Sequence, residues 1–254
     1  MRLLAWLDGA VFEAEKLRVD LPFVQQRIHT LNGVIYHLEQ HINILRTASE
    51  HLFGFASLCG VKDAQRIIGK LLELSRVANT LSVPIVMRLD ATGRLSFEVE
   101  KPTFGAGGYL RAKREVGAVY TMTQPTIEAE TQASVALDSM ADYAVRHIGG
   151  QRAIWVDSNG HLLSRPWQPI FVYYKRCWFT PKMYNSVEYG VIARAIEAAG
   201  YRLYVRDIPE SALELVDEMF VGDIMGISSF SSVKEHRLLS SITTHIASKM
   251  EPKL

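Results

Sequence analysis

The chain has 254 residues, and 48% of them are hydrophobic, which is enough to build the core of one large domain or two modest ones. Lys and Arg total 28 against 27 Asp and Glu, so the net charge of +1 argues against nucleic acid or a membrane surface as the partner. No stretch approaches the roughly 20 apolar residues of a membrane span.

Cysteine content and the N-terminal sequence both point to the cytoplasm. Cys59 and Cys177 are too few for a disulfide framework, which fits a reducing compartment. The apolar run at the N-terminus stops at Asp8 and is too short for a secretory signal peptide. We therefore expect a cytoplasmic protein.

The first half of the chain is expected to form short strands around two helices. Strands are predicted at 3–7, 11–12, 24–30, 84–90, 95–100 and once or twice within 109–123, and helices at 63–79 and from Leu38 onward. An Asn-Gly pair at 32–33 predicts a hairpin turn. Residues 24–30 alternate, which places Gln25, Arg27 and His29 on one face of their strand.

Ile44 is an unexpected residue in the first of these helices. The apolar stripe of that helix consists of Leu38, Ile42, Leu45, Ser49 and Leu52. Ile44 lies off the stripe, near His41 and Ala48, so it is not needed to anchor the helix. We expect it to face something else.

The second half begins after a predicted linker or loop at residues 125–132. Helices are expected at 134–148, 187–199, 238–249 and in a short segment with a Ser211/Glu214 capping box, and strands at 153–156, 170–174, 177–180, 201–207 and 218–221, with a loop at 222–232. The inward residues of the helix at 134–148 are expected to be Leu137, Met140, Ala141, Ala144, Val145 and Ile148.

This order of elements predicts an α+β (α/β) protein of two layered domains. The expected division is a smaller N-terminal domain at 1–122, an interdomain loop at 123–132 and a larger C-terminal domain at 133–254.

Six segments in this order resemble one enzyme family over nearly the whole chain. They are LAWLDG, NGVIYHLEQHINIL, RLDATG, AIWVDSNGHLLS, IFVYYKRCWFTP and LELVDEMFVGDIMGI. The family is that of the fold-type-IV pyridoxal-phosphate (PLP) enzymes, which include branched-chain and D-amino-acid aminotransferases and aminodeoxychorismate lyase. The resemblance implies the two-domain D-amino-acid aminotransferase-like architecture.

The resemblance also implies a lysine whose amine forms a Schiff base with PLP and later moves a proton. The matching position falls near Glu130, and the sequence contains no lysine between Lys113 and Lys175. An ordinary PLP enzyme on this chain would therefore need a displaced lysine, for which Lys113 is the nearest candidate.

Four further family positions also differ in this sequence. The arginine that would bind the cofactor phosphate is Ile44, and the carboxylate that would hold the pyridine nitrogen is Ser164. The phosphate-binding Gly-Thr pair reads Gly222-Asp223, where a carboxylate would repel phosphate, and the glycine-rich segment has become residues 21–23, Leu-Pro-Phe. With the missing lysine these are five losses, which predict that PLP is not bound in the usual manner.

The predicted pocket contains a small set of polar residues. The candidate substrate-binding residues are Gln25, Arg27, Arg88 and Ser164, and the candidate catalytic residues are His29 and Glu130. Arg27 is suited to hold a carboxylate, and the ordinary pKa of His29 suits general acid-base catalysis. The alternative for Arg27 and His29 is a polar strand face in solvent, for Glu130 a loop carboxylate with no role, and for Ser164 a small filler. Further anion-binding candidates are Arg165 and Ser228, Ser229, Ser231 and Ser232.

His37 and His41 have the i, i+4 spacing that can chelate zinc. Leu38 stands where the metalloprotease pattern needs glutamate, and the sequence offers no third ligand nearby. We therefore expect two structural histidines and no metal.

Three functions remain open from the sequence. The first is a PLP-independent enzyme or binding protein for a small anionic metabolite, such as an amino acid or a chorismate-like compound. The second is a non-catalytic partner subunit of an active paralogue, since the family members are homodimers. The third is a true PLP-dependent aminotransferase or lyase with a displaced lysine.

Overall fold

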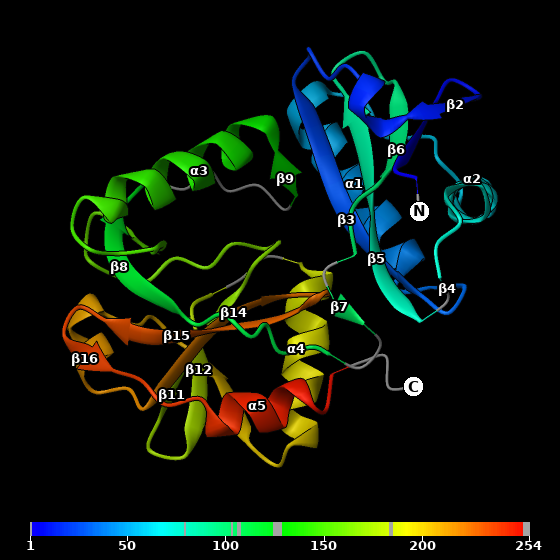
Figure 1. Ribbon diagram of the computed structural model, residues 1–254. Coiled ribbons are helices and arrows are strands. Elements are labelled where there is room, and N and C mark those ends of the chain that lie inside the picture. Colours follow the sequence, from blue (N-terminus) through cyan, green and yellow to red (C-terminus); the bar gives the residue numbers. More distant parts are fainter. Residues whose placement is uncertain are drawn as a thin grey trace. The chain divides into compact units, whose positions relative to one another are not determined.

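The computed structural model describes residues 2–78, 80–102, 104–105, 108–123, 129–182 and 185–250 (Figure 1). The chain divides into two compact units. The first contains the described residues of 1–106 and 127–133, and the second those of 107–126 and 134–253. This division differs from the expected boundary at 122, because the strand at 115–121 pairs only with strands of the second unit among the described residues.

The first unit is built on an eight-stranded sheet. Its strands pair antiparallel among the described residues, in the order β2-β1-β6-β5-β3-β4, with β7 beside β5 and β9 beside β3. The strands are β1 (Leu4–Leu7), β2 (Ala10–Glu13), β3 (Phe23–Leu31), β4 (Val34–Ile35), β5 (Leu81–Asp90), β6 (Leu95–Val99), β7 (Phe104–Gly105) and β9 (Glu130–Thr131). Asn32 and Gly33 form the expected turn, with φ of 54° and 74°.

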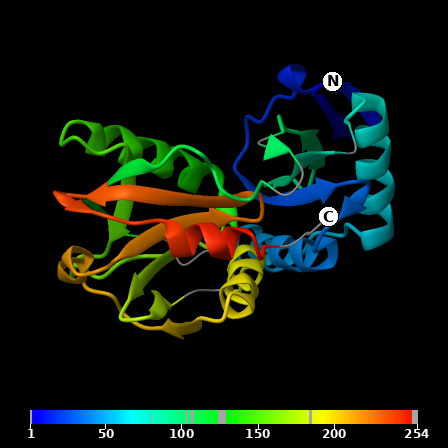
Figure 2. The same ribbon diagram turned by 60° about the horizontal axis from the view of Figure 1, so that its bottom comes forward.

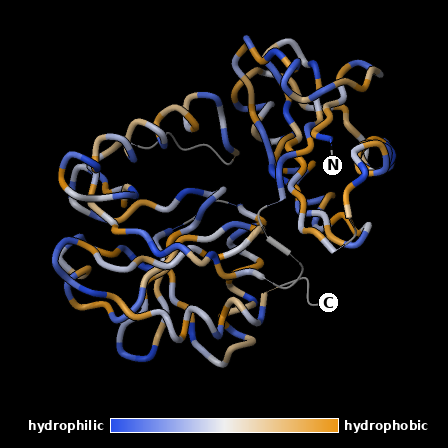
Figure 3. Tube along the Cα trace, viewed as in Figure 1, coloured by the Kyte–Doolittle hydropathy of each residue, from blue (hydrophilic) through white to orange (hydrophobic). Residues whose placement is uncertain are grey.

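The two sides of this sheet differ in polarity. The apolar side includes Val24, Ile28, Ile85 and Met87, all fully buried. Helices α1 (Leu38–Phe53) and α2 (Val61–Ser75) pack on the strands and on each other. The hydrogen bond between His41 of α1 and Gln26 of β3 shows that α1 lies on the apolar side of the sheet. Gln25, Arg27 and His29 alternate along β3 with this apolar set and leave the sheet on the opposite side, and the middle of β3 is coloured as hydrophilic in Figure 3.

The buried face of α1 corrects the expectation for Ile44. Ile44 is 2% exposed and belongs to the core, whereas Leu52, placed on the apolar stripe, is 41% exposed. His41 and Ala48 are also buried. The buried arc is therefore wide enough to include the side on which Ile44 lies, and Leu52 is exposed because it lies in the last turn before Gly54, whose φ of 75° ends the helix.

The second unit contains a mixed sheet of eight strands. Their order is β10-β8-β15-β14-β11-β12-β13, with β16 beside β15. The strands are β8 (Glu115–Thr121), β10 (Arg152–Val156), β11 (Ile170–Tyr174), β12 (Cys177–Thr180), β13 (Arg202–Val205), β14 (Glu218–Asp223), β15 (Gly226–Val233) and β16 (His236–Arg237). Helices α4 (Val187–Ala198) and α5 (Ser241–Ala247) contact each other and both pack on β14 (Figure 2).

Helix α3 (Gln132–Arg146) packs against β8 and β10 through Ala141 and Val145, which surround Trp155. Two residues expected to point inward do not: Met140 is 62% exposed and Ile148 is 69% exposed. Ile148 lies beyond the end of the helix, so the helical period no longer fixes its direction.

Three local expectations in the second unit were wrong. The expected loop at 222–232 is a tight turn followed by β15, which is held between β14 and β8. The expected capping box is a 3-10 helix, Glu210–Glu214, whose cap residue Pro209 has no side chain able to accept a hydrogen bond. The expected helix at 238–249 is shortened to α5, which begins where Glu218 accepts its first backbone N–H groups. Among the described residues, no helix is both long and apolar enough to cross a membrane.

Candidate functional site

The polar side of the first sheet carries the candidate residues Gln25, Arg27 and Arg88. Gln25 and Arg88 are direct partners across β3 and β5, so their side chains leave the sheet on the same side. Strand β9 places Glu130 directly opposite Gln25. Four of the six predicted site residues therefore lie close together, and they come from three segments that are distant in sequence.

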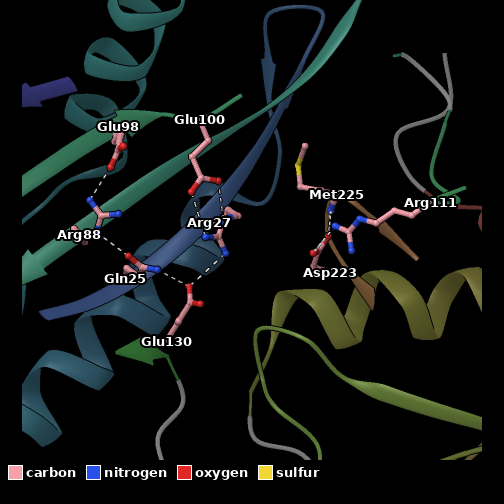
Figure 4. Close-up of polar contacts among 9 residues, drawn as sticks. All are labelled: Gln25, Arg27, Arg88, Glu98, Glu100, Arg111, Glu130, Asp223 and Met225. Carbon is pink, nitrogen blue, oxygen red and sulfur yellow. Dashed lines mark hydrogen bonds and ion pairs between the residues drawn. The ribbon is translucent and has the colours of Figure 1, made fainter. Parts of the chain in front are cut away.

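Hydrogen bonds connect these residues into one row (Figure 4). Arg88 donates from Nη1 to Oε2 of Glu98 at 2.8 Å and from Nε to Oε1 of Gln25 at 2.7 Å. Gln25 then donates from Nε2 to Oε2 of Glu130 at 2.6 Å. Gln25 and Glu130 are 3% and 7% exposed, so the row is largely buried at its centre. A buried network of this kind fixes side-chain positions only when its members are satisfied.

Arg27 extends the row at its other end. Its Nε and Nη2 atoms donate to the two carboxylate oxygens of Glu100 at 2.9 and 3.3 Å, and Nη1 lies 3.4 Å from Oε2 of Glu130. The side chains of Arg27 and Glu100 are both 32% exposed, so their ion pair contributes at most about 1 kcal/mol. Arg27 was expected to hold a ligand carboxylate, but two protein carboxylates already balance its charge.

His29 follows two residues further along β3. It is 2% exposed, its Nε2 lies 2.5 Å from Oγ of Ser82, and its ring stacks on Tyr36 at 5.3 Å between centroids. The structure thus places His29 on the predicted strand face in a buried setting with a hydroxyl neighbour. A histidine needs such a neighbour, or a substrate, to exchange a proton.

Ser164 and Arg165 belong to the second unit. Ser164 is buried and accepts a hydrogen bond from the backbone N–H of Ile170 at 3.1 Å. The guanidinium of Arg165 bonds to Asp138 and lies over the ring of Trp155, 4.9 Å from the ring centroid. The positive charge of Arg165 is therefore already matched inside the protein.

Sequence reasoning missed Arg111, which lies in a segment expected only to form strands. Its Nη2 donates to Oδ2 of Asp223 at 2.7 Å, and its Nη1 donates to Oγ of Ser228 at 3.0 Å. The backbone N–H of Met225 donates to Oδ1 of the same aspartate at 2.7 Å (Figure 4). A half-buried carboxylate at a tight turn needs such donors, so Asp223 itself was the signal that a cation had to lie nearby.

His41 is a buried core histidine. Burial, reinforced by the nearby His37, lowers its pKa from 6.5 to about 3. Nε2 of Gln26 donates to the carbonyl of Gln25, so Oε1 of Gln26 is the acceptor for Nδ1–H of His41 at 2.8 Å. Within the described residues, no group of three or more potential metal ligands gathers at this pair or elsewhere.

Comparison with known proteins places the fold. No protein-family model matches the sequence, and no curated protein matches it either. Solved structures do match over nearly their whole length. An aminotransferase from Brucella abortus bound to PLP has a TM-score of 0.80 at 14% identity, covering 97% of this chain and 96% of that one.

Two further solved structures also match at low sequence identity over nearly the whole of both chains. A branched-chain aminotransferase from Thermoproteus uzoniensis, solved with norvaline, has a TM-score of 0.76 at 18% identity and covers 97% and 93% of the two chains. A fold IV-transaminase from Curtobacterium pusillum has a TM-score of 0.78 at 11% identity and covers 96% of each. The chain therefore has the α+β fold of the fold-type-IV aminotransferases, as its sequence segments predicted.

Proposed function

We propose that this chain is a fold-type-IV scaffold that works without PLP, as a binding protein or enzyme for a small anionic metabolite. One observation carries the proposal: Glu130 stands where the resemblance calls for the Schiff-base lysine, and its carboxylate is held by Gln25 at 2.6 Å. A carboxylate cannot form a Schiff base, and this one is already bonded within the sheet.

The positions expected to hold the rest of the cofactor support the same proposal. Asp223 offers a negative charge where a phosphate would need a donor. The carboxylate of Asp223 also accepts the hydrogen bonds of Arg111 and of the Met225 N–H, so these donors are already used. Ser164 offers a hydroxyl, already engaged with Ile170, where a carboxylate would be needed to hold a protonated pyridine nitrogen. These residues do not fit PLP.

The proposed roles of the first-unit residues follow from their contacts. Arg88 would be the cation that meets a ligand, and Gln25 and Arg27 would hold the connected row in place around it. For the enzyme form of this proposal, His29 and Glu130 are the groups that would move a proton.

An absorption titration tests this proposal. The purified protein is mixed with PLP and compared with free PLP and with the protein alone. We expect the visible spectrum of PLP to stay that of the free cofactor. A new, saturable absorption band at one PLP per chain would contradict the proposal and restore an aminotransferase or lyase with a displaced lysine.

The displaced-lysine alternative has less support. Lys113 is 72% exposed and its Nζ lies 3.6 Å from Oε1 of Glu115. An exposed ammonium that is paired with a carboxylate lacks the enclosed, apolar surroundings in which a lysine amine is activated as a nucleophile.

Asp223 provides a prediction about phosphate. Replacing it by serine (Asp223→Ser) removes the carboxylate from Arg111 and from the N–H of Met225, and the variant should bind inorganic phosphate at least about tenfold more tightly than the natural chain. Repulsion between unit charges 4 Å apart near a protein surface is about 4 kcal/mol, more than the 1.4 kcal/mol that a tenfold change needs. The measurement is the shift of the Met225 amide signal in a phosphate titration by NMR.

Asp207→Ser is the matched control, because Asp207 is exposed and belongs to the same unit. This control should bind phosphate as weakly as the natural chain. Equal phosphate binding by the natural chain and Asp223→Ser would show that Asp223 does not repel the anion.

A homodimer is our proposal for the assembly, and a pairing with a paralogue is its alternative. Met140 and Tyr143 on α3 are each 62% exposed, which is unusual for large apolar side chains on one helix. We predict that light scattering shows a dimer and that the double variant Met140→Glu, Tyr143→Glu weakens it by at least about tenfold, as loss of central interface anchors does.

Val205→Glu supplies the control for this prediction, since Val205 is 51% exposed and lies on β13. It should leave the dimer unchanged. If light scattering shows a monomer at every concentration, the homodimer proposal is contradicted and a paralogue is favoured as the partner.

The cytoplasm is our proposed location. The two cysteines, Cys59 and Cys177, are both free thiols in the structure, which agrees with a reducing compartment. Fractionation of the native host cell, followed by immunoblotting, tests this placement.

A further inference from the structure

A cavity of about 330 Å³ lies within the first unit, beside Arg88. It is enclosed by β1 and β2, by the segment 16–21 and by the facing ends of β5 and β6. Its volume is at the lower end of the range found for small-molecule sites. Its apolar lining comes chiefly from Leu7, Phe12, Leu17, Val19, Leu21 and Phe23.

The charged lining of the cavity is mainly positive. Its cations are Lys16, Arg18, Arg88 and Arg94, and its carboxylates are Asp20 and Asp90. Asp90 is used by its own hairpin turn, where Oδ1 accepts from the backbone N–H groups of Thr92 and Arg94. An anion entering the cavity therefore meets more cations than competing carboxylates.

Arg88 is the fixed cation of this site. Its side chain is 15% exposed, its guanidinium lies 5.4 Å from the ring centroid of Phe23, and Glu98 and Gln25 hold Nη1 and Nε. Nη2 has no hydrogen-bond partner among the described residues. A guanidinium that is held in place loses little entropy when it binds a carboxylate.

The other cations surround the cavity more loosely. Lys16 pairs with Glu13 at 2.7 Å and Arg94 with Asp8 at 3.3 Å, both at exposed positions where ion pairs are weak. Arg18 is exposed and makes no hydrogen bond or ion pair with a described residue. These side chains can turn toward a ligand at small cost.

We propose that this cavity binds a small carboxylate with an apolar body, such as one aromatic ring or one branched chain. Arg88 receives the carboxylate, and Phe12, Leu17 and Leu21 enclose the apolar part. The site rests on the proposed function only in taking the ligand to be a small anion. It places that anion at Arg88, which has one carboxylate partner, Glu98, and lines the cavity, and not at Arg27, which two carboxylates hold.

The test is a titration of the full chain with 3-phenylpropanoate by protein-observed NMR, without PLP. We expect saturable shifts in the amide signals of segment 16–21. The neutral analogue 3-phenylpropanol should bind at least about tenfold more weakly, since it lacks the charge that Arg88 recognises. Inorganic phosphate, which lacks an apolar body, should bind equally weakly.

Two variants separate the charge from the apolar contacts. Arg88→Gln should weaken 3-phenylpropanoate binding by at least about tenfold, and Phe12→Ser should weaken it without removing any charge. Arg66→Gln is the matched control, because Arg66 is an exposed arginine of α2 in the same unit and does not line the cavity. Its affinity should equal that of the natural chain.

Three results would overturn the proposal. They are no saturable binding of 3-phenylpropanoate, full affinity in Phe12→Ser, or phosphate binding as tight as that of 3-phenylpropanoate. Either of the last two results would show that the cavity attracts anions by charge alone and makes no apolar contact with the ligand. Because PLP is absent from this titration, its failure leaves the absorption test of the proposed function unaffected, and a PLP band would leave this site standing.

Discussion

Between pH 7 and pH 5, the free energy of unfolding is expected to fall by about 2 kcal/mol through His41 alone. Burial, with His37 nearby, lowers the pKa of His41 from 6.5 to about 3 in the folded chain. In the window between these two values the unfolded chain binds a proton and the folded chain does not. The stabilisation is therefore fully present above pH 6.5 and is lost as the pH falls.

The full loss, reached near pH 3, is about 5 kcal/mol, a large share of the stability of an ordinary protein. Urea unfolding at a series of pH values measures it. His41→Gln keeps a donor for Gln26 but has no titrating ring. Between pH 7 and pH 5 its free energy of unfolding should therefore fall by about 2 kcal/mol less than that of the natural chain.

His51→Gln is the matched control, because His51 is exposed on the same helix. This variant should retain the acid sensitivity of the natural chain. If His41→Gln also retains it in full, His41 is not the group responsible, and the buried neutral imidazole is the wrong description of this core.

The second large effect is expected at Glu218, which is 1% exposed at the start of β14. Its carboxylate accepts the backbone N–H groups of Ile242 and Thr243 at 2.9 and 2.7 Å, and the hydroxyls of Ser241 and Thr243 at 3.1 and 2.7 Å. It thus caps the N-terminus of α5 from another element.

Glu218→Ala leaves these buried donors without an acceptor and should lower the free energy of unfolding by about 3 kcal/mol. Chemical denaturation measures the loss, and amide exchange in α5 locates it. Glu218→Gln keeps one acceptor oxygen and should lose roughly half as much.

Glu214→Ala is the control for charge, because Glu214 is exposed and lies 3.7 Å from Lys234. It removes the same charge and should change stability by less than about 0.5 kcal/mol. A loss at Glu218→Ala no larger than at Glu214→Ala would mean that the cap contributes nothing.

The polar face of β3 was predictable because its signal is local. Strict alternation over 24–30 placed Gln25, Arg27 and His29 on one side, and the structure has them there. The partners of Arg27 were not predictable: Glu100 and Glu130 lie 73 and 103 residues away. Because these contacts are not visible in the sequence, Arg27 was predicted to be an available anion site, and nothing in the local pattern favoured Arg88 over it.

The core errors have a different cause. Ser228 and Ser229 looked like a loop, yet they lie in β15, between β14 and β8, and are 6% and 2% exposed. Ile44 was read as lying off the apolar stripe, although the buried arc of α1 is wider than a narrow stripe. In both cases tertiary packing, and not local periodicity, decided the burial.

The most direct test of a PLP-independent scaffold is chemical trapping. The protein is incubated with PLP, reduced with borohydride, digested, and its peptides are searched by mass spectrometry for a pyridoxyl group. We predict only traces spread over exposed lysines such as Lys62 and Lys70, and no peptide modified to one group per chain. Stoichiometric modification of a single lysine would contradict the account and show that this chain uses a displaced amine to hold the cofactor.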